Sequence, residues 1–542
     1  MNSYSKKNLY ILFYFFVVLL IGISIFKDYG ISIDEDNRRI NGFVSLKYIF
    51  EIFFPNSVSE ISDFIDVPEM NNWEAQSGII FDLPTAFIEY FFRIEEVRNI
   101  YLMRHLINFL IFFTSVYFFF LLIKRRYDSW IFGILGATLL LASPRIFSNS
   151  FFNNKDIVFM SLFIMSLYFA IIFLENPNIK NSILFSLFSA LSFDVRIMGI
   201  ILPFLIILFY IIKILRNKNF KKNSISPLIL FIILTPIFIV IFWPYLWTDT
   251  LESFLNLFKN LSNKNMFVYN FYFGEYVSSQ NLPWHYSIVW PFITTPISYL
   301  IFFTLGFFVI LFRFIKRIMK IEKNDSNIDI WRGDKELQDL IYILTFLIPI
   351  FMVIDQNVVL YDGWRHLYFI YPSFLMIMLF GLNILKINFF KKRIKWFYIF
   401  SFVSILPIIF WMYKNHPHQN VYFNSLAGKE FNKKFDMDYW GLSNKTALEY
   451  IVASETDNNI KIAKIGSTDL YAGVNILKSE IVQKISIVRD IENADYIINT
   501  KRDWTGRTKI YDDKTPANFK LFHQIKVDGV SINTIYKKVE NF

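Results

Sequence analysis

Residues 157 to 174 read IVFMSLFIMSLYFAIIFL, a run of 18 residues without a charged side chain. A helix that crosses the hydrocarbon core of a membrane needs roughly 20 apolar residues, and fewer when its polar ends reach the interface. Ten further uncharged runs occur, at residues 9–26, 106–123, 129–143, 182–193, 197–212, 226–248, 286–312, 340–354, 367–385 and 396–413. The sequence therefore predicts an all-α polytopic membrane protein with about eleven transmembrane helices, of which 129–143 and 182–193 are short.

The composition agrees with this class. Of the 542 residues, 54% are hydrophobic and 18% are charged, whereas soluble domains have about a quarter charged residues. The net charge of +10 comes from short basic blocks between the apolar runs, so we do not expect a nucleic-acid partner. Cysteine is absent, which excludes disulfides and thiolate metal sites. The first run lacks a small-residue cleavage site, and we expect it to be retained as a helix.

The distribution of Lys and Arg predicts the orientation. If the N-terminus is cytoplasmic and the helices alternate, the inner segments are 1–8, 124–128, 175–181, 213–225, 313–339 and 386–395, with 23 Lys and Arg in 70 residues. The outer segments 27–105, 144–156, 194–196, 249–285 and 355–366 have 13 in 144 residues. This difference has the direction of the positive-inside rule. An odd number of spans then places the C-terminal tail outside an inner or plasma membrane.

The sequence predicts two domains. Residues 1–413 form the membrane domain, and residues 27–105 form its long first outer loop. From residue 414 the composition becomes polar, with strand-like runs at 460–465, 481–488 and 496–499. Asp528-Gly529 lies between two further strand-like runs and is a hairpin signal. Residues 414–542 are therefore expected to form a small extracytoplasmic α/β domain.

Charged residues gather in the outer segments, next to the apolar runs. A carboxylate can accept the proton of an attacking hydroxyl, and the planar fork of Arg can bind a lipid phosphate. Because the clusters come from five connections that face one side, they can assemble one site at the membrane surface. The clusters are Asp34-Glu35-Asp36, Arg145 with Lys155-Asp156, Asp194-Val195-Arg196, Trp284-His285 and Arg365-His366.

Each cluster also has a structural alternative. The acidic residues after the first run could be a solvated loop, and Asp156 could cap a helix. Asp194 and Arg196 could form a structural pair, and His285 could belong to an aromatic belt. The sequence has no glycine-rich phosphate loop, no dinucleotide fingerprint and no HExxH motif, so nothing in it indicates nucleotide binding. A transfer enzyme that faces outward would need another activated donor, and a lipid-linked one fits.

With these motifs the chain resembles the membrane glycosyltransferases of the GT-C class. It is most similar to the dolichyl-phosphate-mannose protein mannosyltransferase family, glycosyltransferase family 39, and its bacterial aminoarabinose transferase relatives. The resemblance covers about residues 1–413 and rests on Ile33-Asp34-Glu35, the Pro144-Arg145 to Lys155-Asp156 loop, Trp284-His285 and Arg365-His366. Segments 416–424 and 438–443 also resemble the tail of bacterial members. The β-trefoil insertion of eukaryotic members has no counterpart, so neither mannose nor a protein acceptor follows from the resemblance.

The resemblance implies roles for individual residues. Asp34 would be the general base, Glu35 would support it, and Asp156 would be a second carboxylate at the acceptor site. Arg145, Lys155, Arg196, His285, Arg365 and His366 would hold the donor phosphate or sugar.

The implied reaction moves a sugar from a polyprenyl-phosphate donor to a hydroxyl of a glycan, lipid or protein acceptor. It would proceed with inversion, without a cofactor and without an obligatory metal. Two other functions remain open. One is a transporter or flippase of lipid-linked saccharides, although the sequence has no clear inverted repeat. The other is a non-enzymatic membrane scaffold.

Overall fold

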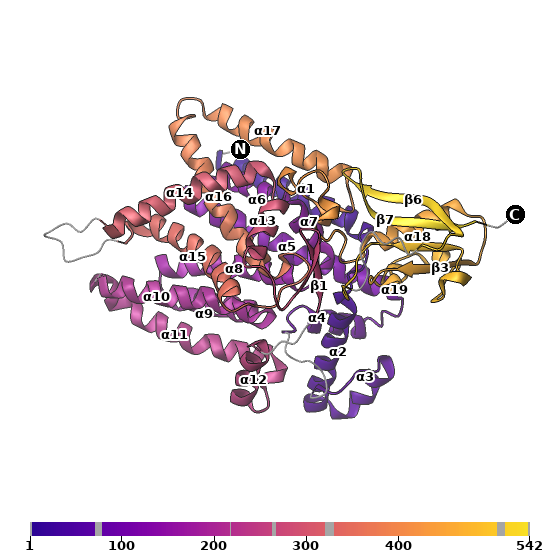
Figure 1. Ribbon diagram of the computed structural model, residues 1–542. Coiled ribbons are helices and arrows are strands. Elements are labelled where there is room, and N and C mark those ends of the chain that lie inside the picture. Colours follow the sequence, from indigo (N-terminus) through magenta and orange to yellow (C-terminus); the bar gives the residue numbers. More distant parts are fainter. Residues whose placement is uncertain are drawn as a thin grey trace.

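The computed structural model describes residues 3–70, 78–216, 218–262, 267–319, 330–506 and 515–539. A bundle of long helices forms most of the molecule, and a small sheet with its own helices lies at one end of the bundle (Figure 1). The predicted fold, a helical membrane protein with a small C-terminal α/β part, is confirmed.

Each of the eleven uncharged runs contains a helix, and the run 286–312 is divided between α13 (Tyr286–Thr294) and α14. The helices are α1 (Ser3–Ile25), α5 (Val97–Tyr127), α6 (Trp130–Leu141), α8 (Asp156–Glu175), α9 (Ile179–Val195), α10 (Ile201–Arg216), α11 (Lys218–Phe242), α14 (Ile297–Met319), α15 (Gly333–Asp355), α16 (Tyr371–Asn388) and α17 (Ile394–Lys414). Within the described ranges, nine helices are long and apolar enough to cross a membrane. The α6 helix and α7 (Pro144–Phe152) are bent by 70° and give a tenth span if the pair counts as one. The α9 helix has only 17 residues, which accounts for the difference from about eleven.

The helices pack through large apolar side chains around α8, whose most apolar window is 83% buried. Glycine allows a close approach between α14 and α16. A Cβ atom on Gly306 would lie 2.0 Å from the carbonyl oxygen of Ile377, and one on Gly381 would lie 2.1 Å from that of Phe302. These two backbones can therefore touch only because neither glycine has a side chain.

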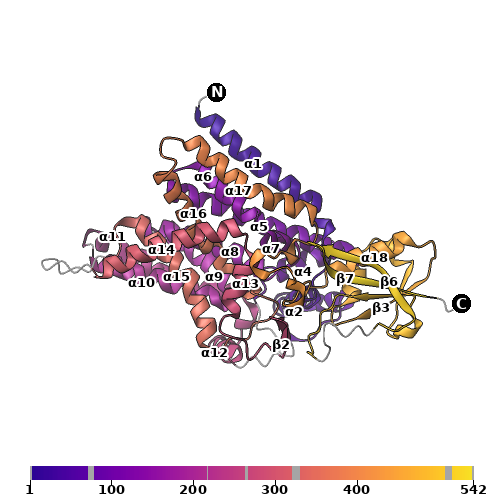
Figure 2. The ribbon, with the colours of Figure 1, turned by 45° about the horizontal axis from the view of Figure 1, so that its top comes forward.

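Contacts between connections support the alternation of the helices. Arg126 pairs with Asp339 at 2.8 Å, and Lys213 pairs with Asp334 at 2.9 Å. These pairs join segments that were predicted to share the inner side, although residues 217 and 320–329 of these segments lie outside the described part. Figures 1 and 2 show α2, α4 and the C-terminal strands at the other end of the bundle. Which end faces the cytoplasm remains a prediction.

The first outer segment is mostly helical. It consists of η1 (Phe26–Asp28), α2 (Asp34–Phe53), η2 (Pro55–Ser57), α3 (Val58–Phe64) and α4 (Asp82–Phe91), and residues 71–77 are not described. The later outer segments and the adjoining ends of the uncharged runs form η4 (Ile197–Ile200), η5 (Pro244–Leu246), α12 (Thr250–Ser262), the hairpin β1 (Tyr269–Tyr272) and β2 (Glu275–Ser278), α13 (Tyr286–Thr294) and η6 (Arg365–Ile370). Of these elements, the β1–β2 hairpin contacts the C-terminal part, where the backbone N–H of Tyr269 donates to the carbonyl oxygen of Trp504 at 3.0 Å.

The C-terminal sheet has five strands in the order β4-β3-β5-β7-β6. They are β3 (Ile460–Ile465), β4 (Ile485–Ile487), β5 (Tyr496–Asn499), β6 (Phe519–Val527) and β7 (Val530–Lys538). The helices of this part are α18 (Ser443–Ser454), α19 (Leu470–Asn475) and α20 (Ser479–Val482). The predicted hairpin at Asp528-Gly529 is confirmed, with positive φ at both residues, as a tight two-residue turn requires.

The segment between α17 and α18 belongs to the packing of the membrane part. Phe423, Phe435 and Trp440 lie in the same apolar cluster as the membrane helices. The sheet has a separate core that includes Leu448, Ile462 and Ile498. The division of the chain into two domains at residue 413 remains a prediction. Some residues after 413 pack in the apolar core of the membrane helices.

Candidate active site

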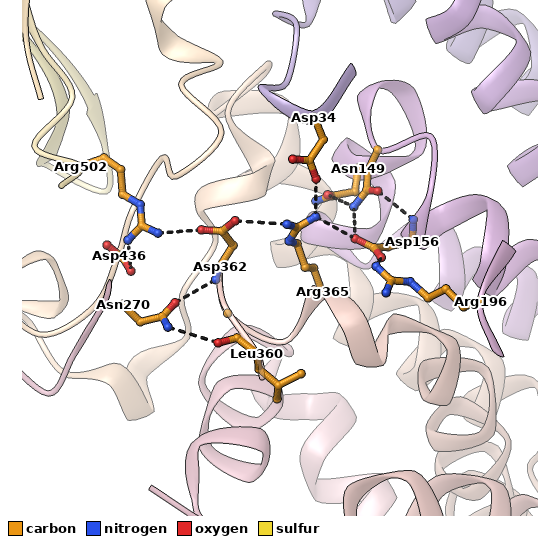
Figure 3. Close-up of polar contacts among 12 residues, drawn as sticks. Asp34, Asn149, Asp156, Arg196, Asn270, Leu360, Asp362, Arg365, Asp436 and Arg502 are labelled. Atoms are coloured by element: carbon orange, nitrogen blue, oxygen red, sulfur yellow. Dashed lines mark hydrogen bonds and ion pairs between the residues drawn. The ribbon is translucent and has the colours of Figure 1, made fainter. Parts of the chain in front are cut away.

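The centre of the candidate site is an ion pair between Arg365 and Asp34. Asp34 begins α2 in the first outer segment, and Arg365 begins η6, which leads directly into α16. The Nη1 atom of Arg365 lies 2.7 Å from Oδ2 of Asp34 (Figure 3). The Arg365 side chain is 2% exposed, whereas that of Asp34 is 39% exposed. Asp34 is therefore a carboxylate that solvent or a substrate can reach, and the buried guanidinium holds one of its oxygens.

A second carboxylate, Asp156, lies behind this pair. It begins α8, where Oδ1 of Asn153 accepts its backbone N–H at 2.9 Å and fixes the start of the helix. Its Oδ1 accepts a short hydrogen bond from Arg196, which directly follows α9. Its Oδ2 lies 3.4 Å from Nη1 of Arg365. Asp156 is thus buried and paired with two cations. Its own side chain does not cap α8, so the alternative of a capping role for Asp156 is wrong.

A third carboxylate, Asp362, joins the cluster from the turn before η6. Its Oδ2 lies 3.4 Å from Nη2 of Arg365, and its Oδ1 lies 2.8 Å from Nη2 of Arg502 in the C-terminal part. Arg502 also pairs with Asp436 at 2.6 Å. Figure 3 shows these side chains as one row of alternating charge that crosses from the membrane helices to the sheet domain.

The turn that carries Asp362 has an uncommon backbone. Asp362 and Gly363 both have positive φ, at 59° and 71°, a conformation that Gly and Asp tolerate better than other residues. The side chain of Asn270 in β1 ties this turn together: it accepts from the Asp362 backbone N–H at 3.0 Å and donates to the Leu360 carbonyl at 3.3 Å. The hairpin of the preceding outer segment therefore sets where Asp362 points.

Burial raises the pKa of Asp362 to about 6, and the positive charges of Arg502 and Arg365 oppose this rise. Burial also raises the pKa of Asp436, again opposed by Arg502. The neighbouring guanidinium groups thus offset part of the effect of burial on both carboxyl groups.

No role of Asp362, Asp436 or Arg502 was predicted from the sequence. Asp362 was visible in the segment before Arg365, but nothing distinguished it from a solvated loop residue. Arg502 follows β5, whose carboxyl end was recognisable as the end of a strand. Ligands and functional side chains often gather at that edge of a parallel sheet, and this was the available signal.

Glu35 points away from this cluster. It accepts from the backbone N–H of Ser32 at 2.7 Å, which satisfies a free donor at the start of α2. Its Oε2 lies 3.1 Å from Nε2 of His105 in α5, and its side chain is 1% exposed. In this arrangement Glu35 fixes α2 to the bundle.

Arg145 lies deep in the site on α7. Its guanidinium lies over the rings of Phe423 and Trp290, at 4.7 and 5.5 Å, and its Nε donates to the Tyr422 carbonyl at 3.0 Å. Its two terminal nitrogens are buried and have no hydrogen-bond partner among the residues that the structure describes. Burial raises the pKa of Tyr439, and the charges of Arg145 and then Arg365 oppose this rise, so the tyrosine lies within reach of both cations.

The remaining predicted residues lie around the cluster. Lys155 directly precedes Asp156 and is half-buried. The Nδ1 atom of His285 lies 2.7 Å from the hydroxyl of Tyr272 in β1. The ring of His366 packs against Tyr361 with centroids 4.7 Å apart. The structure thus brings Asp34, Asp156, Arg196 and Arg365 into direct contact and leaves His285 and His366 in aromatic surroundings.

The cluster has an excess of negative charge. Four carboxylates (Asp34, Asp156, Asp362 and Asp436) face three guanidinium groups (Arg196, Arg365 and Arg502), which gives a net charge of −1. Within the described ranges, no group of three or more His, Cys, Asp or Glu side chains has the geometry of a metal site. An anionic ligand would therefore need cations other than those already paired.

Comparison with known proteins places the chain near one class of enzyme. The family model "Dolichyl-phosphate-mannose-protein mannosyltransferase" matches residues 83–243, from α4 through α11. This part includes Arg145, Lys155, Asp156 and Arg196, whereas Asp34 and Arg365 lie outside it. The family resemblance of the sequence is confirmed over this part of the chain.

Several solved structures are similar to the chain at low sequence identity. ArnT from Cupriavidus metallidurans matches with 10% identity in its apo state and 11% identity bound to undecaprenyl phosphate, with 98% of each chain covered and a TM-score of 0.46 in both cases. The oligosaccharyltransferase of Archaeoglobus fulgidus in complex with zinc and sulfate has 12% identity and a TM-score of 0.38, covering 79% of this chain and 59% of its own. No curated protein matches the sequence.

Proposed function

We propose that the chain is an integral membrane glycosyltransferase that moves a sugar from a polyprenyl-phosphate donor to an acceptor hydroxyl. The observation that carries this proposal is that the two carboxylates beside Arg365 differ in exposure and in the number of their ion pairs. Asp34 is partly exposed and bound through one oxygen, whereas Asp156 is buried and fully paired. The family resemblance over residues 83–243 supports the same class of reaction.

In this mechanism Asp34 is the general base. Its Oδ1 accepts the acceptor proton, while Arg365 holds Oδ2 and fixes the direction of the carboxylate. The acceptor oxygen attacks the anomeric carbon, the bond from that carbon to the lipid-phosphate oxygen breaks, and the polyprenyl phosphate leaves with the electron pair. A single displacement of this kind inverts the anomeric configuration.

The leaving phosphate needs positive charge that the carboxylate cluster does not supply. Because Arg196 and Arg365 are occupied by carboxylates, we assign the phosphate to Arg145. The terminal nitrogens of Arg145 form no ion pair with a carboxylate within the described ranges, and the aromatic rings around it keep out water. Fixed cations in such a dry environment stabilise developing charge more strongly than cations in water.

The reaction can be tested with purified protein in lipid nanodiscs. The probes are polyprenyl phosphates with a radiolabelled mannose or aminoarabinose, offered with glycan, glycolipid and peptide acceptors. Transfer of the label, with release of free polyprenyl phosphate, supports a transferase. Movement of the intact donor across a vesicle membrane without its consumption would support a flippase instead and would overturn the proposal.

Substitution of the base gives a sharper test. We expect Asp34→Asn to lower the rate of transfer by about 100- to 10,000-fold, because amides do not accept a proton at neutral pH. The matched control is Asp63→Asn, an exposed carboxylate on α3 of the same outer segment. Near-normal transfer by Asp34→Asn, or an equal loss in the control, would contradict the role of Asp34.

We also propose that the site faces the exterior or periplasm. The chain has no cysteine, so single cysteines can be introduced without a background signal. A membrane-impermeant maleimide added to intact cells should label Asn56→Cys, in the first outer segment, and not Lys180→Cys, at the start of α9. Both native residues are exposed. The reverse pattern of labelling would invert the topology.

A further inference from the structure

Arg502 lies outside the membrane part and is still buried at the site. It follows β5, at the carboxyl end of the parallel strands β3 and β5, and its side chain is 2% exposed. Nη2 contacts Asp362 at 2.8 Å and Nη1 contacts Asp436 at 2.6 Å. This arginine therefore connects the edge of the C-terminal sheet with the turn before η6.

The path from Arg502 to Asp34 passes through two side chains. Asp362 contacts Arg502 with one oxygen and Arg365 with the other, and Arg365 contacts Asp34 (Figure 3). The side chains of Arg502, Asp362 and Arg365 are 2%, 7% and 2% exposed. Because solvent screens these contacts weakly, the loss of one charge changes the electrostatic interactions of the other side chains in the row.

The backbone holds Arg502 firmly. Its carbonyl oxygen accepts the backbone N–H of Ser467 at 2.8 Å, which ties the loop after β5 to the loop after β3. Gly466 has a φ of +100°, and a Cβ atom there would lie 3.0 Å from the same carbonyl oxygen, so this close approach requires glycine. The sheet domain thus presents the guanidinium in a fixed place.

Other contacts also attach the C-terminal part to the helices. Lys445 donates to the carbonyl oxygens of Lys27 and Asp28, at 2.7 and 2.9 Å, and the indole of Trp411 in α17 donates to Asp528 at 2.8 Å. Because these attachments are independent of Arg502, the removal of its charge leaves the sheet docked. The effect of Arg502 on the site can then be separated from docking.

We propose that Arg502 is a positioning residue of the active site, which holds Asp362 so that Arg365 is aimed at Asp34. This inference rests on the proposed transferase function. It assigns to the C-terminal domain a direct part in catalysis, beyond any binding of the acceptor. Without Arg502, Asp362 would share its charge with Arg365 alone, and Arg365 would be drawn away from Asp34 and Asp156.

The test uses the full-length protein in nanodiscs with the donor that the wild type accepts. We expect Arg502→Gln to lower kcat by roughly 10- to 100-fold and to change KM for the donor less than threefold, because the lost contact orients the base and does not bind the donor. Arg502→Lys, which keeps the charge, should recover part of kcat. Trp411→Phe, which removes a docking contact only, should retain wild-type kcat.

The pH profile gives a second readout that a docking role would not change. Asp362 faces Arg365, Arg502, Asp34, Asp436, Tyr286, Tyr361 and Tyr439. Arg502 is the first of the two cations that lower the pKa of Asp362, so Arg502→Gln should move the acidic limb of the kcat profile to higher pH. The double variant Arg502→Gln with Asp362→Asn should lose little more activity than Asp362→Asn alone, because both act through one contact.

The outcomes separate the two proposals. Absence of transfer by the wild type with every donor overturns the transferase function and this inference with it. Transfer by the wild type, its loss in Asp34→Asn, and an unchanged kcat and acidic limb in Arg502→Gln would overturn the role of Arg502 alone. Equal losses in Trp411→Phe and Arg502→Gln would also overturn it, since they would indicate docking.

Discussion

Replacement of Arg365 by lysine tests the geometry of the site most directly. The guanidinium contacts Asp34 through Nη1 and Asp362 through Nη2, at 2.7 and 3.4 Å. Lysine keeps the positive charge but has one nitrogen on a flexible stem, so it cannot hold two carboxylates in a fixed relation. Arg365→Lys should therefore fold and still lose the orientation of Asp34.

The size of the effect follows from these contacts. The short contact with Asp34 is a charge-assisted hydrogen bond, which contributes about 1.5–3 kcal/mol when made in a buried site. If this contact orients the base in the transition state, its loss lowers kcat by roughly 10- to 150-fold. The longer contact with Asp362 adds less, because hydrogen bonds weaken steeply with distance.

The assay is single-turnover transfer from the polyprenyl-phosphate donor, with the enzyme in excess of the donor and saturating, so that binding does not limit the rate. Arg313→Lys is the matched control, because Arg313 contacts Asp339 at 2.8 Å at the opposite end of the bundle. The control should transfer at the wild-type rate. A rate for Arg365→Lys within threefold of the wild type would refute the positioning of Asp34 by Arg365.

Three further predictions concern pH and stability. As the pH falls through about 6, Asp362 takes up a proton and the transfer rate should fall, whereas Asp362→Asn should be slow and show no such limb in a rate profile from pH 5 to 8. Arg126→Met removes one of the two cations beside the buried Asp339 and should destabilise the inner end by about 3 kcal/mol, seen as a lower melting temperature. Asp438→Ala removes the acceptor for two backbone N–H groups at the start of α18, at a cost of about 1–2 kcal/mol, and should speed hydrogen exchange in that helix.

The helical fold was predictable because membrane helices follow from uncharged length alone. Every uncharged run contains a helix, since backbone groups in lipid must be paired within the segment. The number of spans was less predictable. The run 129–143 ends where the chain bends at Pro144, and the bend depends on how α7 packs against the site. Composition carries no information on that packing.

The site was predictable in part. Alternation of the helices placed Asp34, Asp156, Arg196 and Arg365 on one side, and the structure brings these four into contact. The sequence could not separate Asp34 from Glu35, because neighbours on a helix point about 100° apart and either could face the site. In the structure Glu35 turns toward the bundle, where it contacts the backbone N–H of Ser32 and His105 on α5.

The contact of Arg502 with Asp362 could not be predicted, because 140 residues separate the two and no local pattern links them. This contact gives the C-terminal part a role in the active site as well as any role in binding an acceptor. A domain that only recruited an acceptor could be joined to the helices by surface contacts, which contribute little and tolerate change. A buried guanidinium between two carboxylates is costly unless its geometry is kept, so the sheet has to stay in one position for the row of charges to remain paired. The arrangement of the base thus depends on the fold of a domain that lies wholly after the last membrane helix.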